Sequence, residues 1–215
     1  MKIIHYINQF FAGIGGEEKA DQEPFIKDEL IGPAVALNAM VKPNGGEVTH
    51  TIVCGDNFMG SKTEEAVETI LGFLRDKEFD LFVAGPAFQA GRYGFACGTI
   101  CKAVEKEFGV PVLTSMHVEN PGVEMFHKDM PIFIGGKSAA KMRADVQFIA
   151  DYINKDLTGA PHTGAVAEHF FPRGVRHQAW VEGMPCAARR GVDMLLKKLH
   201  GEPYQTELII PAKDL

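Results

Sequence analysis

The sequence predicts an α/β fold with a doubly wound, mostly parallel five-stranded sheet, in a flavodoxin-like or Rossmann-like three-layer αβα arrangement. Three observations lead to this prediction. Short apolar runs typical of buried parallel strands recur along the chain. Segments in which apolar residues repeat with the helical period separate these runs. Most of the connections are short, as in folds that alternate strand and helix.

Five runs are predicted as strands because apolar residues occupy nearly every position, which suits strands covered on both faces. They span residues 3–10, 48–55, 81–85, 112–118 and 132–135. In open α/β sheets, ligands bind outside the carboxyl ends of the strands. We therefore expect the functional site in the turns that follow these strands.

Helices are predicted between and after the strands. Pro33 fits the first turn of a helix that runs to Val41. Ser61 with Glu64 predicts a capping box, and Ser138 predicts an N-cap. The apolar positions expected to face the core are Val67, Ile70, Leu71 and Leu74, then Met142, Val146, Ile149 and Ile153. Two further helices are expected at residues 99–108 and 186–200.

Two segments break the alternation of strand and helix. Residues 11–31 form an unusually long connection, which in a compact domain is typically functional or mobile. Residues 159–185 are rich in Gly, Pro, His and aromatic residues. We therefore predict an α/β sheet domain over residues 1–158. Residues 159–215 are expected to form an irregular loop, a helix and an extended tail, which pack on the sheet domain or lead to a further half.

Composition excludes several classes of protein. The net charge of −6 argues against a nucleic-acid partner, and no apolar run is long enough to span a membrane. The N-terminus turns polar too soon for a signal peptide, and the four cysteines form neither a disulfide framework nor a CxxC motif. A reducing cytoplasm is therefore the expected compartment. The histidines lack the spacing of metal ligands, so no metal site is expected.

The turn at residues 85–94 is the most informative candidate site. It follows a predicted strand and combines small residues with Arg92 and Tyr93. Arg92 can bind a carboxylate through two parallel hydrogen bonds. The glycines at 91, 94 and 98 share one helix face, which permits close backbone packing. The substrate contacts predicted here are Gly85, Pro86, Gln89, Gly91, Arg92 and Tyr93.

The loop at residues 13–21 is a second candidate, next to Asn8 at the end of the first strand. Its glycines allow close approach of a ligand, and its charged side chains could bind an amino group or transfer protons. A flexible, solvated loop is the alternative, and the sequence leaves both open. The spacing is not GxGxxG, so no dinucleotide fingerprint is present. The residues predicted to bind substrate are Asn8, Gly15, Gly16 and Lys19, with Glu17 and Glu18 as catalytic candidates.

Two turns narrowly miss nucleotide-binding motifs. In residues 54–63 one extra residue separates the second glycine from the Lys–Thr pair, and residues 131–138 have Pro where the first glycine belongs. Either turn could still hold an anion at a helix N-terminus. Cys54, at the carboxyl end of a strand, is a candidate substrate contact and the better thiol candidate. Cys97 and Cys101 share a helix face with apolar residues, so we expect them in the core.

The turn at residues 116–122 adds Glu119 as a catalytic candidate and Asn120 as a substrate contact, both before a sharp Pro–Gly turn. Late in the chain, residues 172–176 could bind a partner or close the crevice; a surface turn is the alternative.

Taken together, these stretches resemble the selenoprotein B component of the glycine, sarcosine and betaine reductases. The resemblance covers nearly the whole chain. Gln89 stands where it leads us to expect Asn. The segments that carry it are HYINQFFAGIGGEEKAD (5–21), GPAF (85–88), AGRYG (90–94), ACGT (96–99), ENPGV (119–123), PRGVR (172–176) and VDML (192–195).

The resemblance implies that the chain is the substrate-binding half or subunit of such a reductase, inactive alone. In such reductases a pyruvoyl group on a partner subunit forms a Schiff base with the substrate amine. A selenol attacks the neighbouring carbon, the C–N bond breaks, and the carbon fragment passes to selenoprotein A. Arg92 would then hold the substrate carboxylate, and Glu17, Glu18 or Glu119 would pair with cationic nitrogen or move protons.

The resemblance also implies a second half of similar size that carries selenocysteine, whereas this sequence stops at Leu215. We therefore expect no cofactor in this chain, with selenocysteine and the pyruvoyl group on partner polypeptides. A fragment, a split subunit and a stand-alone relative all stay open, as does homo-oligomerisation.

Three other functions stay open. One is a binding module for a small amine or carboxylate without redox activity. Another is a flavodoxin-like electron carrier, although the first loop lacks a Ser/Thr-rich phosphate cradle. The third is an isomerase or racemase that uses Cys54 with Glu119. The sequence does not distinguish glycine, sarcosine and betaine as the substrate.

Overall fold

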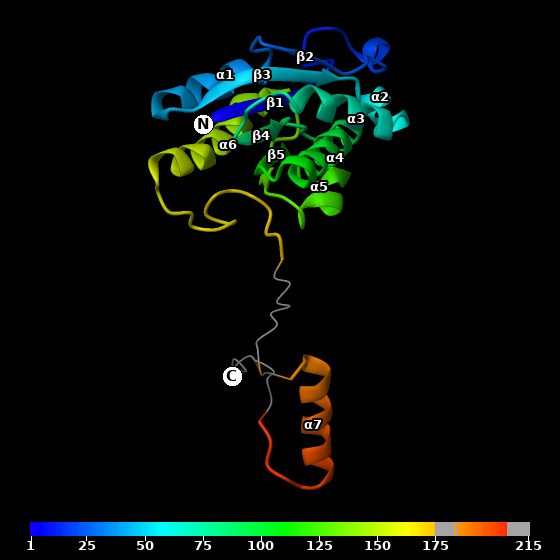
Figure 1. Cartoon of the computed structure of the whole chain (residues 1–215), viewed down its shortest axis with the longest axis vertical. Helices are drawn as coiled ribbons and strands as arrows, with labels where there is room; N and C mark the ends of the chain where they lie inside the picture. The colour runs from blue at the N-terminus through cyan, green and yellow to red at the C-terminus, as the bar shows by residue number, and fades with distance from the viewer. Residues whose placement is uncertain (175–182, 184, 206–215) are drawn as a thin grey trace. The chain divides into compact units, whose positions relative to one another are not determined.

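The computed structural model describes residues 1–174, 183 and 185–205. It divides into two compact units, Met1–Gly174 and Val175–Leu215 (Figure 1). Residues 175–176 of the predicted partner-binding turn and residues 206–215 of the predicted tail lie outside the described residues. Within the described part of the chain, no helix combines the length and the apolar character needed to cross a membrane.

A six-stranded sheet forms the centre of the first unit, in the order β2-β3-β1-β4-β5-β6. Five strands run parallel, which confirms the predicted α/β class and mostly parallel sheet and corrects the number of strands from five to six. The strands are β1 (Lys2–Asn8), β2 (Phe25–Lys27), β3 (Glu47–Cys54), β4 (Leu81–Ala84), β5 (Val112–Met116) and β6 (Ile132–Ile134).

The sixth strand, β2, lies inside the connection that was predicted as a long loop. Phe25 pairs with Val53 and Ile26 with Ile52, antiparallel to β3 at the edge of the sheet. The opposite edge is also paired, because the Ile134 N–H donates to the His169 carbonyl and the Phe171 N–H donates to the Ile132 carbonyl (2.9 Å each).

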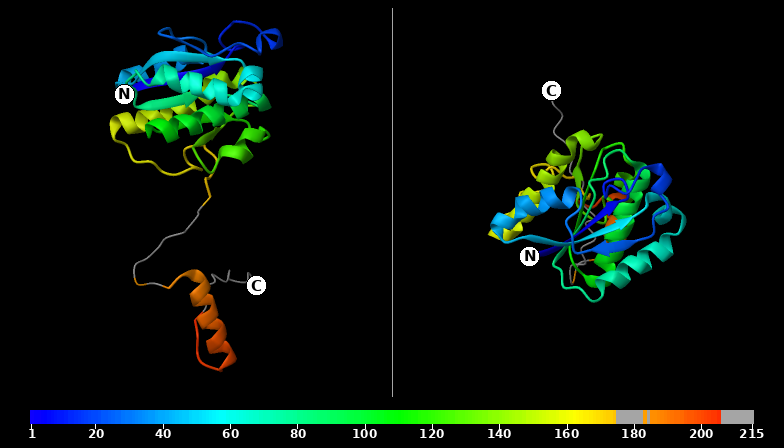
Figure 2. Two further views of the ribbon diagram at one scale, coloured as in Figure 1. Left: turned by 45° about the vertical axis from the view of Figure 1, so that its right-hand side comes forward. Right: turned by 90° about the horizontal axis from the view of Figure 1, so that it is seen from above.

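Helices pack against both faces of the sheet (Figure 2). The side chains of β1 alternate between the two faces: Ile3 joins the core under α1 and α6, whereas Ile4 and Tyr6 join the core under α3, α4 and α5. The helices of this unit are α1 (Pro33–Val41), α2 (Asp56–Ser61), α3 (Thr63–Leu74), α4 (Gly91–Phe108), α5 (Pro121–Phe126) and α6 (Met142–Thr158), with short 3-10 turns η1 (Glu17–Lys19), η2 (Lys42–Asn44) and η3 (Ala139–Lys141).

Helix α4 begins at Gly91, eight residues before the predicted start at 99. Its glycines are a packing surface, as the sequence predicted: an added Cβ would lie 2.1 Å from the Asn120 side chain at Gly94 and 2.1 Å from the Phe126 ring at Gly98. Glycine is a poor helix former, so the sequence carries no helical signal over the first turns of α4. Gly94 and Gly98 in these turns are the positions that α5 and its N-cap approach most closely.

The capping box predicted at Ser61 is wrong, whereas Ser138 is the N-cap residue of η3, as predicted. Ser61 ends α2 and donates its hydroxyl to the Asn57 carbonyl at 2.7 Å, while Lys62 is the N-cap of α3. Ser138 precedes η3 but makes no side-chain cap hydrogen bond, and α6 begins at Met142. Short helical turns occupy these strand-to-helix connections, which moves each longer helix further along the chain.

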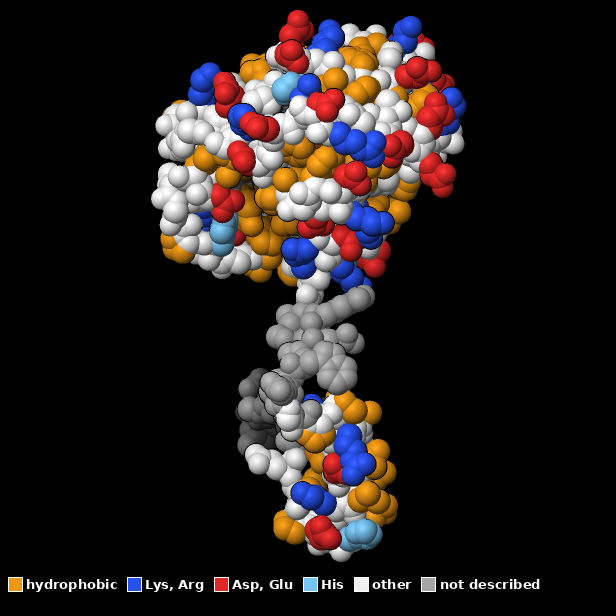
Figure 3. Space-filling model, viewed as in Figure 1, with side chains coloured by type: hydrophobic (Ala, Val, Ile, Leu, Met, Phe, Trp, Pro, Cys, Tyr) orange, Lys and Arg blue, Asp and Glu red, His pale blue; other side chains and the backbone are white. Residues whose placement is uncertain are grey.

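In the second unit, α7 (Ala187–Leu199) confirms the predicted helix at residues 186–200. None of its residues is buried, and apolar side chains gather along one side of it (Figure 3). These side chains are Val192, Leu195, Leu196 and Leu199.

Candidate functional site

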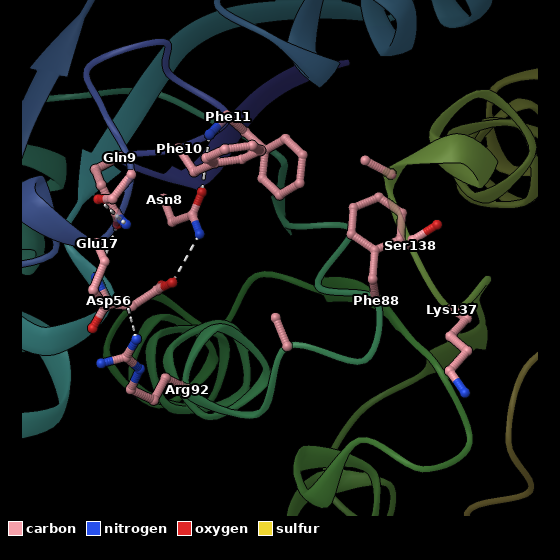
Figure 4. Close-up of a pocket in the computed structure, with 13 residues that line it drawn as sticks. Asn8, Gln9, Phe10, Phe11, Glu17, Asp56, Phe88, Arg92, Lys137 and Ser138 are labelled. Carbon is pink, nitrogen blue, oxygen red and sulfur yellow. Dashed lines mark hydrogen bonds and ion pairs between the residues drawn. The ribbon is translucent and has the colours of Figure 1, made fainter.

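A cavity of about 380 Å³ opens at the carboxyl ends of the strands of the first unit (Figure 4). Four of the fifteen residues predicted from the sequence line it: Asn8, Gly16, Glu17 and Arg92. Nine lining residues were not in the predicted set: Gln9, Phe10, Phe11, Asp56, Phe88, Ala90, Lys137, Ser138 and Ala139.

Two buried amides at the end of β1 organise the inner wall. The Asn8 side chain donates to Asp56 Oδ2 at 2.8 Å and accepts the Phe11 N–H at 3.1 Å. The Gln9 side chain accepts the Asp56 N–H at 3.1 Å and donates to the Gly16 carbonyl at 3.4 Å. These bonds explain the polar residues Asn8 and Gln9 at and just after the end of β1, because they join β1, the first loop and α2.

Asp56 is the buried carboxyl group of the cavity, with 8% of its surface exposed. Desolvation raises its pKa to about 6, against the hydrogen bond from Asn8 and the attraction of Arg92. Its Oδ1 atom is buried without a hydrogen-bond partner in the described structure. A carboxyl group with this pKa is mostly ionised at pH 7 and can accept hydrogen bonds from a ligand.

The first loop is folded onto α2 rather than free. The Ala20 carbonyl accepts the N–H groups of Asn57 (2.9 Å) and Phe58 (3.1 Å) and so satisfies the helix start. Gly55 is required at this contact, because an added Cβ would lie 2.1 Å from the Ala20 carbonyl oxygen. The same loop thereby fixes the position of Asp56.

Glu17 and Arg92 form an ion pair on the cavity wall. Their hydrogen bond lowers the pKa of Glu17 and raises the pKa of Arg92. Both side chains are more than half exposed, so solvent screens the pair and a ligand can exchange with either partner.

Three other predicted residues, Glu18, Lys19 and Gly15, make contacts within the loop itself. Glu18 accepts the Gly16 N–H at 2.9 Å, and backbone hydrogen bonds, including this one, lower the pKa of Glu18. The Lys19 side chain covers Gly15, where an added Cβ would lie 2.5 Å from it. Glu18, Lys19 and Gly15 do not line the cavity.

Glu119 joins a second polar group beside the cavity. It accepts a hydrogen bond from the Gln89 amide at 2.6 Å and lies 3.9 Å from the Lys137 ammonium. Lys137 lines the cavity, on the side opposite Asn8 and Asp56 in Figure 4. Gln89 and Glu119, both predicted site residues, are hydrogen-bonded to each other. Neither of them lines the cavity.

The Lys137 turn is positioned by a buried carboxyl group. Both oxygens of Asp145 accept the Gly136 N–H, at 3.0 and 2.9 Å. Gly135 must lack a side chain, because an added Cβ would lie 2.6 Å from the Ser115 hydroxyl. The turn that resembles part of a phosphate loop therefore serves to place Lys137 and Ser138 at the cavity.

Gly85 and Pro86 are joined by a cis peptide bond and lie behind the cavity wall. The Gly85 carbonyl oxygen lies 2.6 Å from His5 Nε2, so this nitrogen carries the proton. Burial lowers the pKa of His5 to about 4, so the ring is neutral. Gly91 follows as the first residue of α4.

Asn120 holds the loop that carries Phe88. Its amide donates to the carbonyls of Phe88 (2.8 Å) and Ala90 (3.1 Å), and its oxygen accepts the Gly122 N–H (2.9 Å). The Phe88 backbone has a left-handed φ of 54°, and Phe88 lines the cavity. Asn120 is buried and does not line the cavity.

Cys54 and Tyr93 are both buried behind the cavity wall. Desolvation raises the pKa of Cys54 to about 12, which disfavours the thiolate. Tyr93 stacks on Phe11 at 5.8 Å, and its hydroxyl has no partner in the described structure. Cys97 and Cys101 are buried in the same core, as predicted.

Three aromatic rings give the cavity an apolar wall. The Phe11 ring lies 5.2 Å from Phe10 and 5.5 Å from Phe88. Across residues 1–174, 183 and 185–205, no cluster of three or more His, Cys, Asp or Glu side chains could hold a metal ion. The side chains that line the cavity, which are carboxylates, cationic groups and aromatic rings, suit recognition of a small charged ligand.

Sequence signals existed for several residues outside the predicted set. Gln9 and Asp56 follow β1 and β3 at the same edge as the predicted residues, and Lys137 and Ser138 follow β6. Phe10, Phe11 and Phe88 lie in segments 5–21 and 85–88, which carry the family resemblance, but the sequence predicted no role for their rings.

Comparison with known proteins places the chain among reductase components. A family model described as "Glycine/sarcosine/betaine reductase selenoprotein B" matches residues 1–215. The chain is 59% identical over 213 residues to "Betaine reductase complex component B subunit beta" of Peptoclostridium acidaminophilum, covering 99% of the chain and 48% of the relative. No solved structure matches the chain.

Two further relatives from the same organism match the chain over its whole length and 48% of their own. They are "Glycine reductase complex component B subunit gamma", 45% identical, and "Sarcosine reductase complex component B subunit beta", 42% identical. The chain therefore spans about half the length of the curated relatives it matches.

Proposed function

The chain belongs to the glycine/sarcosine/betaine reductase selenoprotein B family, and we propose that it is the substrate-binding half or subunit of such a component B. In this role it takes part in reductive C–N cleavage of a small amino acid or its N-methyl derivative. The observation that carries the proposal is the cavity at the carboxyl ends of the strands, in which carboxylates, cations and aromatic rings converge. The family membership confirms the resemblance predicted from the sequence.

The lining of the cavity suits a small zwitterion. Arg92 and Lys137 offer positive charge to a carboxylate, and Arg92 can do so through two parallel hydrogen bonds. Glu17 offers negative charge to a cationic nitrogen, and because it is exposed it can leave Arg92 when a ligand carboxylate takes its place. Glu119 and Gln89 would act on the same ligand through Lys137.

The nucleophile would come from outside the first unit. Burial raises the pKa of Cys54, Cys97 and Cys101, so none of these thiols suits nucleophilic attack near neutral pH. When docked at the cavity, a selenol would supply the nucleophile and a pyruvoyl group would activate the substrate nitrogen. We propose that both belong to partner polypeptides of a complex that also includes selenoprotein A, in keeping with relatives named as complex components.

We also propose that the fold is flavodoxin-like. The five parallel strands lie in the order β3-β1-β4-β5-β6 across the sheet. Numbered among themselves along the chain, they have the order 2-1-3-4-5, which is the strand order of flavodoxin-like folds.

A binding module without redox activity is the second candidate. It is favoured by the location of the whole cavity within Met1–Gly174. Such a module would bind an amino acid without any partner.

Recovery of the native assembly tests the proposal. The tagged chain is expressed in its native cells, isolated with its bound proteins, and supplied with glycine, sarcosine or betaine and a thiol reductant. We expect release of ammonia, methylamine or trimethylamine, abolished by Arg92→Ala and kept by the control Arg75→Ala, which removes an exposed arginine remote from the cavity. An assembly that releases none of these amines contradicts the proposal, and amino-acid binding by the isolated chain would then favour the binding module.

A further inference from the structure

We propose that Asp56 is the anionic group that binds the ammonium end of the ligand in the cavity. The inference rests on the proposed function and deepens it, since it assigns the substrate nitrogen to one carboxylate. The ligand class is a small organic ammonium ion, with or without N-methyl groups.

Of the charged side chains around the cavity, the Asp56 carboxylate is the one without an ion-pair partner among the described residues. Arg92 is paired with Glu17, and Lys137 lies 3.9 Å from Glu119, so each pair is close to neutral. Within the described residues, Asp56 forms no ion pair, and the side chains hydrogen-bonded to it, Asn8 and Gln9, are neutral amides. Arg92 attracts the Asp56 carboxylate only from beyond ion-pair distance, because it is hydrogen-bonded to Glu17. The inner end of the cavity therefore carries a net negative charge that a bound cation would balance.

Burial makes this imbalance costly. Asp56 is 8% exposed and receives one side-chain hydrogen bond, from Asn8, although a carboxylate can accept about four. A buried charge without a counter-ion is strongly unfavourable, so such a group in a cavity wall is better explained by a ligand than by packing. Figure 4 shows the Asp56 carboxylate directed toward Asn8, between β1 and α4.

The rest of the wall fits an ammonium ion. The rings of Phe11 and Phe88 lie 5.5 Å apart and both line the cavity. Aromatic faces attract cations, and they contact N-methyl groups without leaving a polar group unpaired. Ala90 adds a small apolar side chain. A primary ammonium would donate hydrogen bonds to Asp56, and a quaternary ammonium would contact the rings.

Binding of simple ions tests the assignment on the 215-residue chain. Methylammonium, tetramethylammonium and acetate are titrated into the wild type, Asp56→Asn and the control Asp21→Asn. The control removes the same charge from an exposed carboxylate that is bonded to Asn57 and does not line the cavity. We expect each cation to bind the wild type and the control with the same affinity. Asp56→Asn should lower the affinity for methylammonium roughly tenfold or more. Equal cation binding by Asp56→Asn, or no cation binding by the wild type, overturns the proposal.

A second measurement needs no substitution. The carboxyl carbon of Asp56 is followed by NMR through a pH titration of the wild type with and without methylammonium. The groups near this carboxyl that share the titration are Glu17, Arg92, Tyr6, Tyr93, Cys54 and Cys97. A bound cation favours the ionised carboxylate, so we expect the midpoint to fall when methylammonium is present. An unchanged midpoint overturns the proposal.

The two proposals fail separately. Cation binding that depends on Asp56, in a chain whose native assembly releases no amine, would reject the reductase role and keep the ammonium site. Amine release that survives Asp56→Asn without loss of substrate affinity would keep the reductase role and reject the site.

Discussion

Asn8 donates its side-chain amide to Asp56 across 2.8 Å and thereby connects the last residue of β1 with the first residue of α2. The same amide group accepts the Phe11 N–H, so a single side chain orients both the buried carboxylate and the turn that carries the aromatic wall. Loss of this side chain would affect stability and the electrostatics of the cavity together.

Asn8→Ala is expected to lower the free energy of unfolding by about 1–3 kcal/mol, because it leaves a buried carboxyl oxygen and a backbone N–H without partners. It also removes a bond that stabilises the ionised carboxylate, so the pKa of Asp56 should rise further. Urea unfolding and NMR of the Asp56 carboxyl check both effects. Asn57→Ala, which removes an exposed Asn–Asp bond, is the control and should change stability much less.

Asp56→Asn is expected to stabilise the chain at neutral pH. The pKa of Asp56 is raised from 3.8 to about 6 on folding, so the folded state holds its proton more tightly than the unfolded state. Stability of the wild type should therefore fall as pH rises from about 4 to above 6, by up to about 3 kcal/mol. The variant should not lose stability over this pH range. Denaturant unfolding at pH 4, 6 and 8 measures the free energy of unfolding of both proteins. A wild type and variant that differ equally at all three pH values would contradict the expected linkage.

The parallel strands were predictable because continuous apolar runs report burial on both faces, as in Leu81–Ala84. The three residues of β2 were not, because Phe25 and Ile26 gain their strand conformation only by pairing with β3. The beginning of α4 was hidden for a related reason: Gly94 and Gly98 serve contacts with α5, and local propensity carries no information about such contacts.

The edge of the sheet that carries the site was predictable, but the identity of its buried group was not. Glu17 and Arg92 stood out as charged residues in a glycine-rich context, and they do line the cavity. Asp56 lies in a turn that reads as an imperfect nucleotide-binding motif. Its burial follows from packing of the first loop over Gly55, which is a tertiary contact between segments far apart in sequence.

Gly98→Ala tests the contact between α4 and α5. An added methyl group would lie 2.1 Å from the Phe126 ring, so we expect a loss of about 1–3 kcal/mol in the free energy of unfolding. Gly72→Ala in α3 is the matched control, since nothing lies within 4 Å of an added methyl group. It should gain about 0.5–1 kcal/mol from helix propensity. Urea denaturation of both variants compares them, and equal gains would argue against close packing at Gly98.

His162 is expected to hold the segment after α6 in a pH-dependent way. Its ring lies 2.7 Å from Asp156 Oδ1 and 3.0 Å from Glu168 Oε1, and the hydrogen bond to Asp156 raises its pKa. A raised histidine pKa contributes stability that is present below pH 6.5 and is lost as pH rises through the folded-state value. Exchange of the Thr163 amide, which donates to Glu168, should accelerate at alkaline pH beyond the intrinsic rate.

His162→Asn should remove that dependence, whereas His200→Asn in the second unit should leave it unchanged. Protection of the Thr163 amide that follows only the intrinsic rate in the wild type would contradict the role given to His162.

Alkylation separates the cysteines and addresses the isomerase alternative. Cys186 is exposed, whereas Cys54, Cys97 and Cys101 are buried. Iodoacetamide at pH 8 should therefore label Cys186 alone in the folded chain, as read by peptide mass spectrometry, because buried thiols with a raised pKa are neither accessible nor ionised. Labelling of Cys54 as fast as Cys186 would restore it as a candidate nucleophile.

The pairing at the two edges of the sheet limits how other polypeptides can join this unit. β2 presents only three residues on one side, one of them Lys27, and the chain around His169 covers β6 on the other. Short charged edges and covered edges are the features by which sheet proteins avoid edge-to-edge association. Both edges of this sheet therefore disfavour extension of the sheet into a neighbouring polypeptide.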